Sequence, residues 1–307
     1  MKTSTGKLEG VIPALLIPYR ENGAIDFALL EKQTDYLVSK GVHGIFINGS
    51  TGESAYLSTD EKAEIVKTVV AVARKARSTN PATPALCAAC IQPSTEQTLK
   101  ELEVMAKLEP DYIVAVTPFY FKVDQDIILD HYRKIAKASP VPVIAYDIPS
   151  CTHNKIHLHT ILKIAEIPNI HGIKDSSGDF ITFCRAISTP VKEGFSWIQG
   201  DDYLDAASFH MGASGIVTGT GNVWIDPYLE LFQAIRAGDS KKANECQKKI
   251  NALCEVFQVV GGKVIPGIKT ATYLLGRSNR WMHQRAMTLT EEEITRVRKV
   301  LEGLGLL

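Results

Sequence analysis

Short apolar runs alternate with amphipathic segments along most of the 307 residues, and this alternation constrains the fold more than any other feature. The runs are rich in β-branched residues and lack polar alternation, which is typical of strands buried on both faces of a parallel sheet. Eight runs have this character: 11–17, 44–48, 85–89, 112–116, 141–146, 172–174, 196–199 and 215–218. Each one is followed by a segment with helical periodicity.

The helical segments carry start and stop signals. Asp26 precedes the segment 27–39, and Ser94 with Gln97 forms a capping-box pattern at the start of the segment 94–108. The other expected helices of this part are 59–76, 126–138, 157–165, 179–187, 203–211 and 227–237. Eight strand–helix units in about 230 residues fit a closed barrel. A doubly wound sheet is less favoured, because no Gly-x-Gly-x-x-Gly follows the first strand.

We therefore predict an α/β fold in which a (β/α)8 TIM barrel spans residues 1–230. Residues 231–307 contain no strand-like run, and three segments there look helical: 241–259, 264–275 and 291–304. We expect this part to form a C-terminal helical extension. No linker-like segment separates it from the barrel, so the extension should pack tightly.

Composition excludes several classes of function. Lys and Arg total 34, as do Asp and Glu, and a chain with zero net charge is a poor candidate for nucleic-acid binding. No apolar run approaches the roughly 20 residues of a membrane span, and residues 1–10 lack the apolar core of a targeting signal. We expect a cytoplasmic protein. Cys87 and Cys90 lie in an apolar run and are predicted to be buried strand thiols, and no cysteine–histidine cluster indicates a metal site.

Active sites of such barrels form at the C-terminal ends of the strands. Lys174 ends the sixth run, so its amine should lie at the barrel mouth. Desolvation lowers the pKa of a lysine amine, and a neutral amine attacks a carbonyl to form a Schiff base. The resulting iminium is an electron sink for making or breaking the neighbouring C–C bond. The simpler interpretation is a surface lysine paired with Asp175.

Other reactive residues follow the remaining strands. The sequence Asn-Gly-Ser-Thr-Gly-Glu at 48–53 could form an anion-binding nest with added hydroxyl donors, or an ordinary turn. Tyr146 could carry a proton, or it could be a core tyrosine. The aromatic residues at 119–121 could form a packing plug or a subunit contact. Thr218 and Gly219 could allow close approach of a ligand, or they could form an ordinary turn. The loop at 200–202 contains two acidic residues, but the sequence shows no further metal ligands at a suitable spacing.

These segments together resemble the dihydrodipicolinate synthase / N-acetylneuraminate lyase family of Schiff-base aldolases. The matching motifs are Gly-Ser-Thr-Gly-Glu (49–53), Thr-Pro-Phe-Tyr (117–120), Tyr-Asp-Ile-Pro (146–149) and Gly-Ile-Lys-Asp (172–175). They occur in the family's order, and the likeness covers nearly the whole chain. The resemblance implies a (β/α)8 barrel, usually a homotetramer, that acts on pyruvate and an aldehyde without a metal or organic cofactor.

The resemblance also implies roles for individual residues. Lys174 would form the Schiff base with the pyruvate ketone, and Tyr146 would shuttle protons at the reacting bond. Ser50 and Thr51 would hold the pyruvate carboxylate, and Ser50 would link Tyr146 to Tyr120. In the synthases, the equivalent of Tyr120 reaches across a tight dimer interface. The remaining residues expected to border the substrate are Gly49, Thr218 and Gly219.

The chain departs from the synthase pattern at two motifs. Synthases usually carry Tyr-Asn-Val-Pro-Ser-Arg-Thr-Gly, whereas residues 146–153 read Tyr-Asp-Ile-Pro-Ser-Cys-Thr-His. Cys151 replaces the arginine that receives the carboxylate of the aldehyde substrate, and the loss of a bidentate donor is not conservative. The motif at 49–52 also reads Gly-Ser-Thr-Gly, as in the lyases. We therefore expect an aldolase that reversibly cleaves a 2-keto-3-deoxy sugar acid or another 4-hydroxy-2-oxo acid to pyruvate and an aldehyde.

Three alternatives remain open. The chain could be a dihydrodipicolinate synthase (4-hydroxy-tetrahydrodipicolinate synthase), which condenses pyruvate with aspartate semialdehyde. It could use the same Schiff base as a dehydratase or hydratase-aldolase, whose dehydration products would lack an aldehyde. It could also be a non-catalytic barrel that binds pyruvate, although the intact set of Lys174, Tyr146, Ser50 and Thr51 argues against that.

Overall fold

The computed structural model describes residues 7–77 and 83–307; residues 1–6 of the N-terminal segment considered above lie outside this part. Within it, eight parallel strands form one sheet in the order β1-β8-β7-β6-β5-β4-β3-β2. The strands are β1 (Gly10–Pro13), β2 (Gly44–Ile47), β3 (Ala85–Cys90), β4 (Tyr112–Val116), β5 (Val143–Asp147), β6 (Ile170–Asp175), β7 (Ser196–Gln199) and β8 (Gly215–Thr218). The sheet closes on itself beyond β1, where Ala14 bridges Phe46 of β2 and the Leu15 N–H donates to the Phe46 carbonyl at 2.9 Å.

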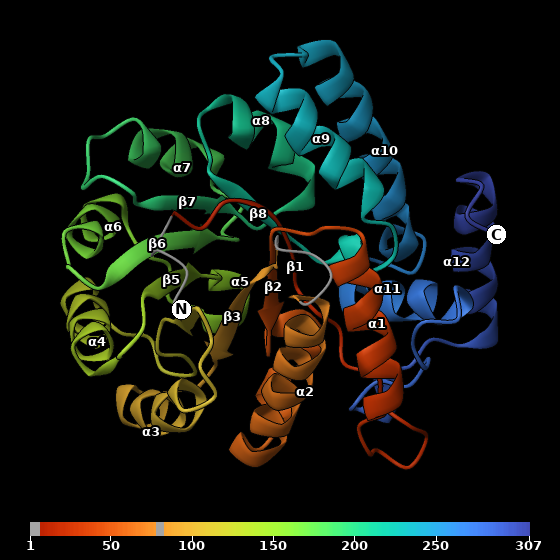
Figure 1. The fold of residues 1–307 in the computed structure, drawn as a ribbon, viewed down its shortest axis with the longest axis horizontal. Helices are drawn as coiled ribbons and strands as arrows, with labels where there is room; N and C mark the ends of the chain where they lie inside the picture. The colour runs from red at the N-terminus through yellow and green to blue at the C-terminus, as the bar shows by residue number, and fades with distance from the viewer. Residues whose placement is uncertain (1–6, 78–82) are drawn as a thin grey trace.

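Helices surround the strands, and the predicted TIM barrel is confirmed (Figure 1). They are α1 (Phe27–Ser39), α2 (Thr59–Arg77), α3 (Thr95–Ala106), α4 (Gln125–Ala138), α6 (Leu158–Ala165), α7 (Phe180–Ile187), α8 (Asp205–His210) and α9 (Asp226–Arg236). Their starts follow the capping residues: Asp26 accepts the Leu29 N–H, and Ser94 accepts the Gln97 N–H at 3.3 Å. Helix α5 (Pro149–Thr152) was not predicted; it is a single turn at the barrel mouth that begins at a proline.

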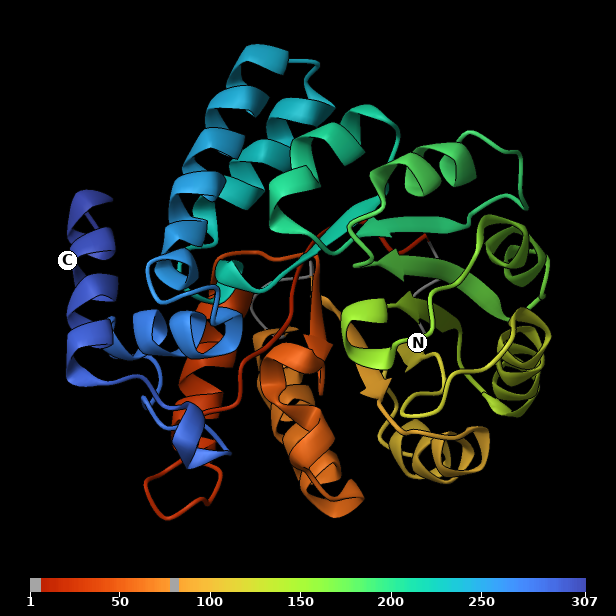
Figure 2. The same cartoon turned by 180° about the vertical axis from the view of Figure 1, so that it is seen from behind.

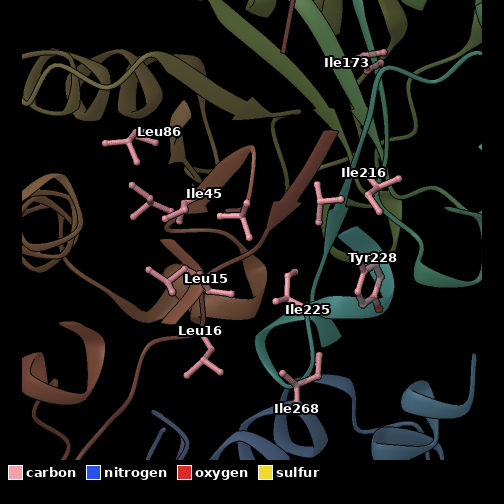
Figure 3. Close-up of a cluster of buried hydrophobic side chains, with 14 of the residues drawn as sticks. Leu15, Leu16, Ile45, Leu86, Ile173, Ile216, Ile225, Tyr228 and Ile268 are labelled. Atoms are coloured by element: carbon pink, nitrogen blue, oxygen red, sulfur yellow. The ribbon is translucent and has the colours of Figure 1, made fainter. Parts of the chain in front are cut away.

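The barrel wall divides the apolar core into two parts, because successive strand residues face opposite sides. Ile12, Phe46 and Ile144 belong to the cluster inside the barrel. The larger cluster lies between the strands and the helices, and Figure 3 shows Ile45 and Ile216 among its members. Ile268 of the C-terminal extension joins this outer cluster near Ile225 (Figure 3). Cys87 and Cys90 are buried free thiols of β3, as predicted.

The C-terminal extension consists of α10 (Ser240–Gln258), α11 (Val264–Leu274) and α12 (Glu291–Gly303). Helix α10 packs against α9, and α11 and α12 pack against α10 and each other. Figure 2 shows these helices gathered on one side of the barrel, near α1 and α9. The three predicted helices are thus confirmed. The predicted division at residue 230 falls within α9, and it stays a prediction. None of the helices in the described residues is both long and apolar enough to cross a membrane.

Candidate active site

Lys174 lies at the C-terminal end of β6 and points into the barrel. Its side chain is only 5% exposed, and its register partners are Tyr146 of β5 and Ile198 of β7. The Lys174 Nζ lies 3.9 Å from the centroid of the Tyr146 ring and 4.4 Å from that of the Phe46 ring. In the part of the chain that the structure describes, no hydrogen bond or ion pair involves this amine. The surface pair with Asp175 is therefore wrong, since adjacent strand residues face opposite sides of the wall.

Glycine at position 200 makes room for the lysine stem. A Cβ atom at Gly200 would lie 2.8 Å from Lys174 Cε and 2.1 Å from Ser176 Oγ, both closer than real contacts allow. Gly200 therefore lets the loop after β7 pass directly beside the reactive side chain. From the sequence this residue was assigned only to a loop at the barrel mouth.

Tyr146 is fixed on both sides of its strand. Its ring meets the Phe46 ring edge-to-face, with 5.8 Å between centroids. From behind, the Tyr146 N–H donates to the hydroxyl of the buried Tyr132 at 3.3 Å, and this hydroxyl donates to the Ala115 carbonyl at 3.1 Å. Phe46 was not among the predicted site residues, because an apolar residue on a strand carries no chemical signal. Its ring nevertheless forms one wall beside the Lys174 amine.

The loop predicted to hold a carboxylate, residues 48–53, packs against the Phe46 ring, which also lies beside the Lys174 amine. A Cβ atom at Gly49 would lie 2.5 Å from Phe46 Cε1, so the glycine backbone rests on this ring. Ser50 and Thr51 begin a 3-10 turn that ends at Gly52. A Cβ atom at Gly219 would lie 3.6 Å from Thr51 Oγ1, which places the loops after β2 and β8 together. Thr218 is directed elsewhere, since its hydroxyl accepts the Gly221 N–H at 2.9 Å.

Glu53 ties the same loop to the C-terminal extension. It takes a left-handed conformation (φ 58°), and its carboxylate forms a buried ion pair with Lys269 of α11. The second carboxylate oxygen accepts the His283 N–H at 2.9 Å, and the Tyr19 hydroxyl donates to the Gly52 carbonyl at 3.2 Å. Burial lowers the pKa of Lys269 to about 8, although Glu53 opposes this shift. Nothing in the sequence indicated that Lys269 supports the loop.

Two buried carboxyl groups, those of Asp147 and Asp175, lie next to Tyr146 and Lys174 along the strands. Asp147 and Asp175 follow Tyr146 and Lys174 directly and are register partners on β5 and β6. Burial raises the pKa of Asp147 to about 7, with a further contribution from the charge of Asp175. Lys155 partly compensates, with its Nζ 3.4 Å from an Asp147 oxygen. Among the described residues, no group of three or more His, Cys, Asp or Glu side chains is arranged to hold a metal ion.

Tyr120 is not brought together with the other candidates in the single chain. It is 79% exposed, has a left-handed φ of 76°, and its ring contacts Phe121 edge-to-face at 4.9 Å. Neither Tyr120 nor Ser50 forms a hydrogen bond to Tyr146 in the described residues. The predicted hydroxyl chain is therefore absent from the isolated chain.

The whole sequence was compared with models of known protein families. The sequence model of the dihydrodipicolinate synthetase family matches residues 7–304. The chain belongs to the dihydrodipicolinate synthetase family. The fold and family that the motifs indicated are thus confirmed, and this family member has the fold of the pyruvate-dependent aldolases.

Several similar proteins are named as synthases of this family. The 4-hydroxy-tetrahydrodipicolinate synthase of Bifidobacterium longum (strain NCC 2705) is 31% identical over 264 residues, 84% of each chain. The 4-hydroxy-tetrahydrodipicolinate synthase of Corynebacterium aurimucosum is 30% identical over 296 residues, 96% of this chain and 94% of the other. Among solved structures, the chloride-inhibited dihydrodipicolinate synthase of Acinetobacter baumannii, complexed with pyruvate, superposes with a TM-score of 0.90 at 27% identity. That match covers 98% of this chain and 100% of the other.

Proposed function

We propose that the protein is a class I aldolase that joins pyruvate to an aldehyde, or releases it, through a Schiff base on Lys174. The observation that carries this proposal is the buried Lys174 amine, which lies against two aromatic rings and has no ion-pair partner in the described residues. An unpaired amine is available as a nucleophile. The pyruvate complex of the Acinetobacter baumannii relative supports pyruvate as the oxo-acid substrate.

The residues have distinct roles in this mechanism. The Lys174 amine attacks C2 of the 2-oxo acid, water leaves, and a protonated imine (iminium) forms. Ser50 and Thr51 hold the carboxylate with hydroxyl groups, assisted by the backbone of the glycine-rich turn that starts at Gly49. In the cleavage direction, Tyr146 accepts the proton of the C4 hydroxyl, and the C3–C4 electron pair moves into the iminium. The enamine then takes a proton at C3, and water releases pyruvate and Lys174.

Two substrate classes compete for the aldehyde half. The names of the relatives favour 4-hydroxy-tetrahydrodipicolinate synthase, which would use aspartate semialdehyde. Cys151, in place of the arginine of the synthase pattern, favours cleavage of another 4-hydroxy-2-oxo acid, for which a 2-keto-3-deoxy sugar acid is one candidate. A dehydratase on the same Schiff base would give products without an aldehyde.

We also propose that the protein acts in the cytoplasm as a homotetramer in which Tyr120 completes the site of a neighbouring copy. The support is its exposed ring, which makes its only ring contact in the described residues with Phe121. No metal or organic cofactor takes part in this proposal.

Borohydride reduction in the presence of pyruvate tests the central step. We expect the Lys174 peptide to gain the mass of one reduced pyruvate adduct, while a sample without pyruvate gains nothing. An unmodified Lys174 peptide, or an adduct on another lysine, would refute the proposed function.

A further inference from the structure

A cavity of about 220 Å³ opens at the C-terminal face of the barrel, beside the proposed reaction centre. Its lining includes Ser50, of the carboxylate loop, and Val116 of β4. Val116 pairs with Tyr146 in the sheet, and Tyr146 pairs with Lys174. A lining residue is thus the direct strand neighbour of the proposed proton carrier, so the cavity is suited to hold the part of the substrate beyond the bond that reacts.

The walls of this cavity are mostly hydrocarbon and thioether. Ile91, Phe119 and Ile148 line it from the barrel loops, and Met282 and Met287 line it from the C-terminal extension. Met282 is fully buried, whereas Met287 is exposed. Such walls favour apolar groups by removing them from water, and methionine thioethers make favourable contacts with aromatic rings.

Positive charge is missing from the walls. The lining residues in the described part of the chain include no Lys, Arg or His, and Cys151 occupies the place of the arginine in the synthase pattern. The cations nearby are engaged elsewhere: Lys269 pairs with Glu53, and Arg285 donates to the carbonyls of Met282 and Arg20. A carboxylate placed in this cavity would lose its hydration without gaining a charged partner, which is unfavourable.

Four lining residues carry hydroxyl groups, Ser50, Ser54, Tyr56 and Thr152, and the buried Ser54 Oγ has no hydrogen-bond partner in the described residues. Glu53 is the charged lining residue, but its two oxygens are taken by Lys269 and the His283 N–H. The Thr152 hydroxyl donates to the Ile148 carbonyl at 3.1 Å. The cavity therefore does not match an aldehyde that carries a carboxylate, and its few hydroxyls would satisfy only a small part of an aldehyde covered with hydroxyls.

We infer that the aldehyde half-site accepts an uncharged aldehyde with a branched or aromatic hydrocarbon substituent. This inference rests on the proposed function and names its substrate class. In the condensation direction, C3 of the enamine attacks the aldehyde carbon and a C–C bond forms. The aldehyde oxygen takes the proton that Tyr146 donates, and water adds to the iminium and releases Lys174. The product is a 4-hydroxy-2-oxo acid with a hydrocarbon group on C4, and the reaction needs no oxidant or reductant.

A panel of aldehydes tests this inference on the wild-type protein. Pyruvate is combined in turn with benzaldehyde, 3-methylbutanal, succinic semialdehyde and glyceraldehyde, and kcat/KM for formation of the 4-hydroxy-2-oxo acid is measured. We expect benzaldehyde or 3-methylbutanal to exceed both polar aldehydes by about tenfold or more. Equal or faster turnover of succinic semialdehyde or glyceraldehyde would overturn the inference.

The borohydride experiment separates the two levels of the proposal. If pyruvate is trapped on Lys174 but the polar aldehydes react faster, only the substrate class is wrong. If no pyruvate is trapped, the proposed function itself is wrong.

A matched pair of variants tests the same inference at one residue. Cys151→Arg restores a cation in the cavity, and Cys151→Ser keeps the site small and uncharged. We expect Cys151→Arg to shift the kcat/KM ratio of succinic semialdehyde to 3-methylbutanal by about tenfold toward the carboxylate, because the guanidinium supplies the missing partner. Cys151→Ser should leave this ratio within about threefold of wild type. An unchanged ratio in a folded Cys151→Arg protein would contradict the inference, and the wild-type panel decides if that variant does not fold.

Discussion

Three lysines are buried among the residues that the structure describes, and their surroundings differ in kind. Lys62 forms an ion pair with the buried Glu101 at 2.9 Å, and Lys269 forms one with the buried Glu53. Lys174 lies against aromatic rings without any carboxylate partner. A buried lysine with a partner holds two parts of the structure together, whereas a buried lysine without one is available for chemistry. The same substitution at these positions should therefore have opposite consequences.

Lys174→Met should have the largest effect on activity and a small effect on stability. We expect kcat/KM to fall by about 10⁴-fold or more, because the covalent step is lost. The free energy of unfolding should stay the same or increase, since methionine fills the space without burying an amine. Activity assays and urea unfolding measure the two effects. A variant that lost several kcal/mol of stability would show that Lys174 is a structural lysine.

Lys269→Met should do the reverse. Removing this partner leaves the Glu53 carboxylate buried and uncompensated, which costs about 3–5 kcal/mol of stability. Because Glu53 closes the turn that contains Ser50 and Thr51, we also expect a higher KM for pyruvate. Urea unfolding and steady-state kinetics test both effects.

Lys62→Met is the matched control, because the Lys62 side chain pairs with Glu101, and the bond from Asn48 Nδ2 to the Lys62 backbone carbonyl, at 3.1 Å, does not depend on that side chain. It should lose comparable stability without a change in the pyruvate KM. The double variant Glu53→Gln/Lys269→Met should recover part of the lost stability, since no charge then remains unpaired. A pyruvate KM that rises equally in Lys62→Met and Lys269→Met would refute a specific link between Lys269 and the turn.

Asp147 and Asp175 are a buried pair of like charges, in contrast to the buried ion pairs of Lys62 and Lys269. The folded protein holds the Asp147 proton up to about pH 7, whereas the unfolded chain releases it near pH 4. The folded state therefore binds more protons between these values, and stability is lost as the pH rises through this window. Asp147→Asn removes the titration and should stabilise the protein by up to about 4 kcal/mol above the window, with little effect below it. Thermal unfolding at about pH 4 and about pH 8 measures the difference, and an equal gain at both would argue against this account.

The sequence was sufficient to predict much of the fold because local and tertiary preferences agree. The capped segment 27–39 and the strand 112–116 match the structure residue for residue. The apolar run 11–17 was predicted too long. Its first part forms β1, and the Leu15 N–H still donates to the Phe46 carbonyl of β2. From Leu16 the chain leaves the strand ladder while staying buried, and the Leu16 N–H donates to Asn222 Oδ1. Apolar character reports burial, and it does not report where a strand ends.

The candidate site was predictable where it depends on position along a strand. Lys174 and Tyr146 were placed at strand ends by the apolar pattern, and the structure places them side by side. Gly200 and Lys269 were missed, because their roles arise from contacts between distant parts of the chain. The Glu53–Lys269 pair spans 216 residues, and no periodicity or motif connects its two halves.

The region around Lys269 is complete within one chain. The position of Tyr120 raises the question of whether the site around Lys174 is complete in one chain as well. The Lys269 pair is buried within a single chain, but Tyr120 is exposed and lies apart from Tyr146. If Tyr120 serves the site of a neighbouring copy, Tyr120→Phe should lower kcat/KM by about tenfold by removing one hydroxyl from the proton path.

Co-expression of Tyr120→Phe with Lys174→Met then distinguishes the two arrangements. In a mixed dimer, the site that keeps Lys174 receives an intact Tyr120 from the partner, so activity should rise above that of Tyr120→Phe alone. If Tyr120 acts within its own chain, every site in the mixture lacks either the lysine or the hydroxyl. Activity would then not exceed that of the Tyr120→Phe subunits present, and the proposal of a shared site would be wrong.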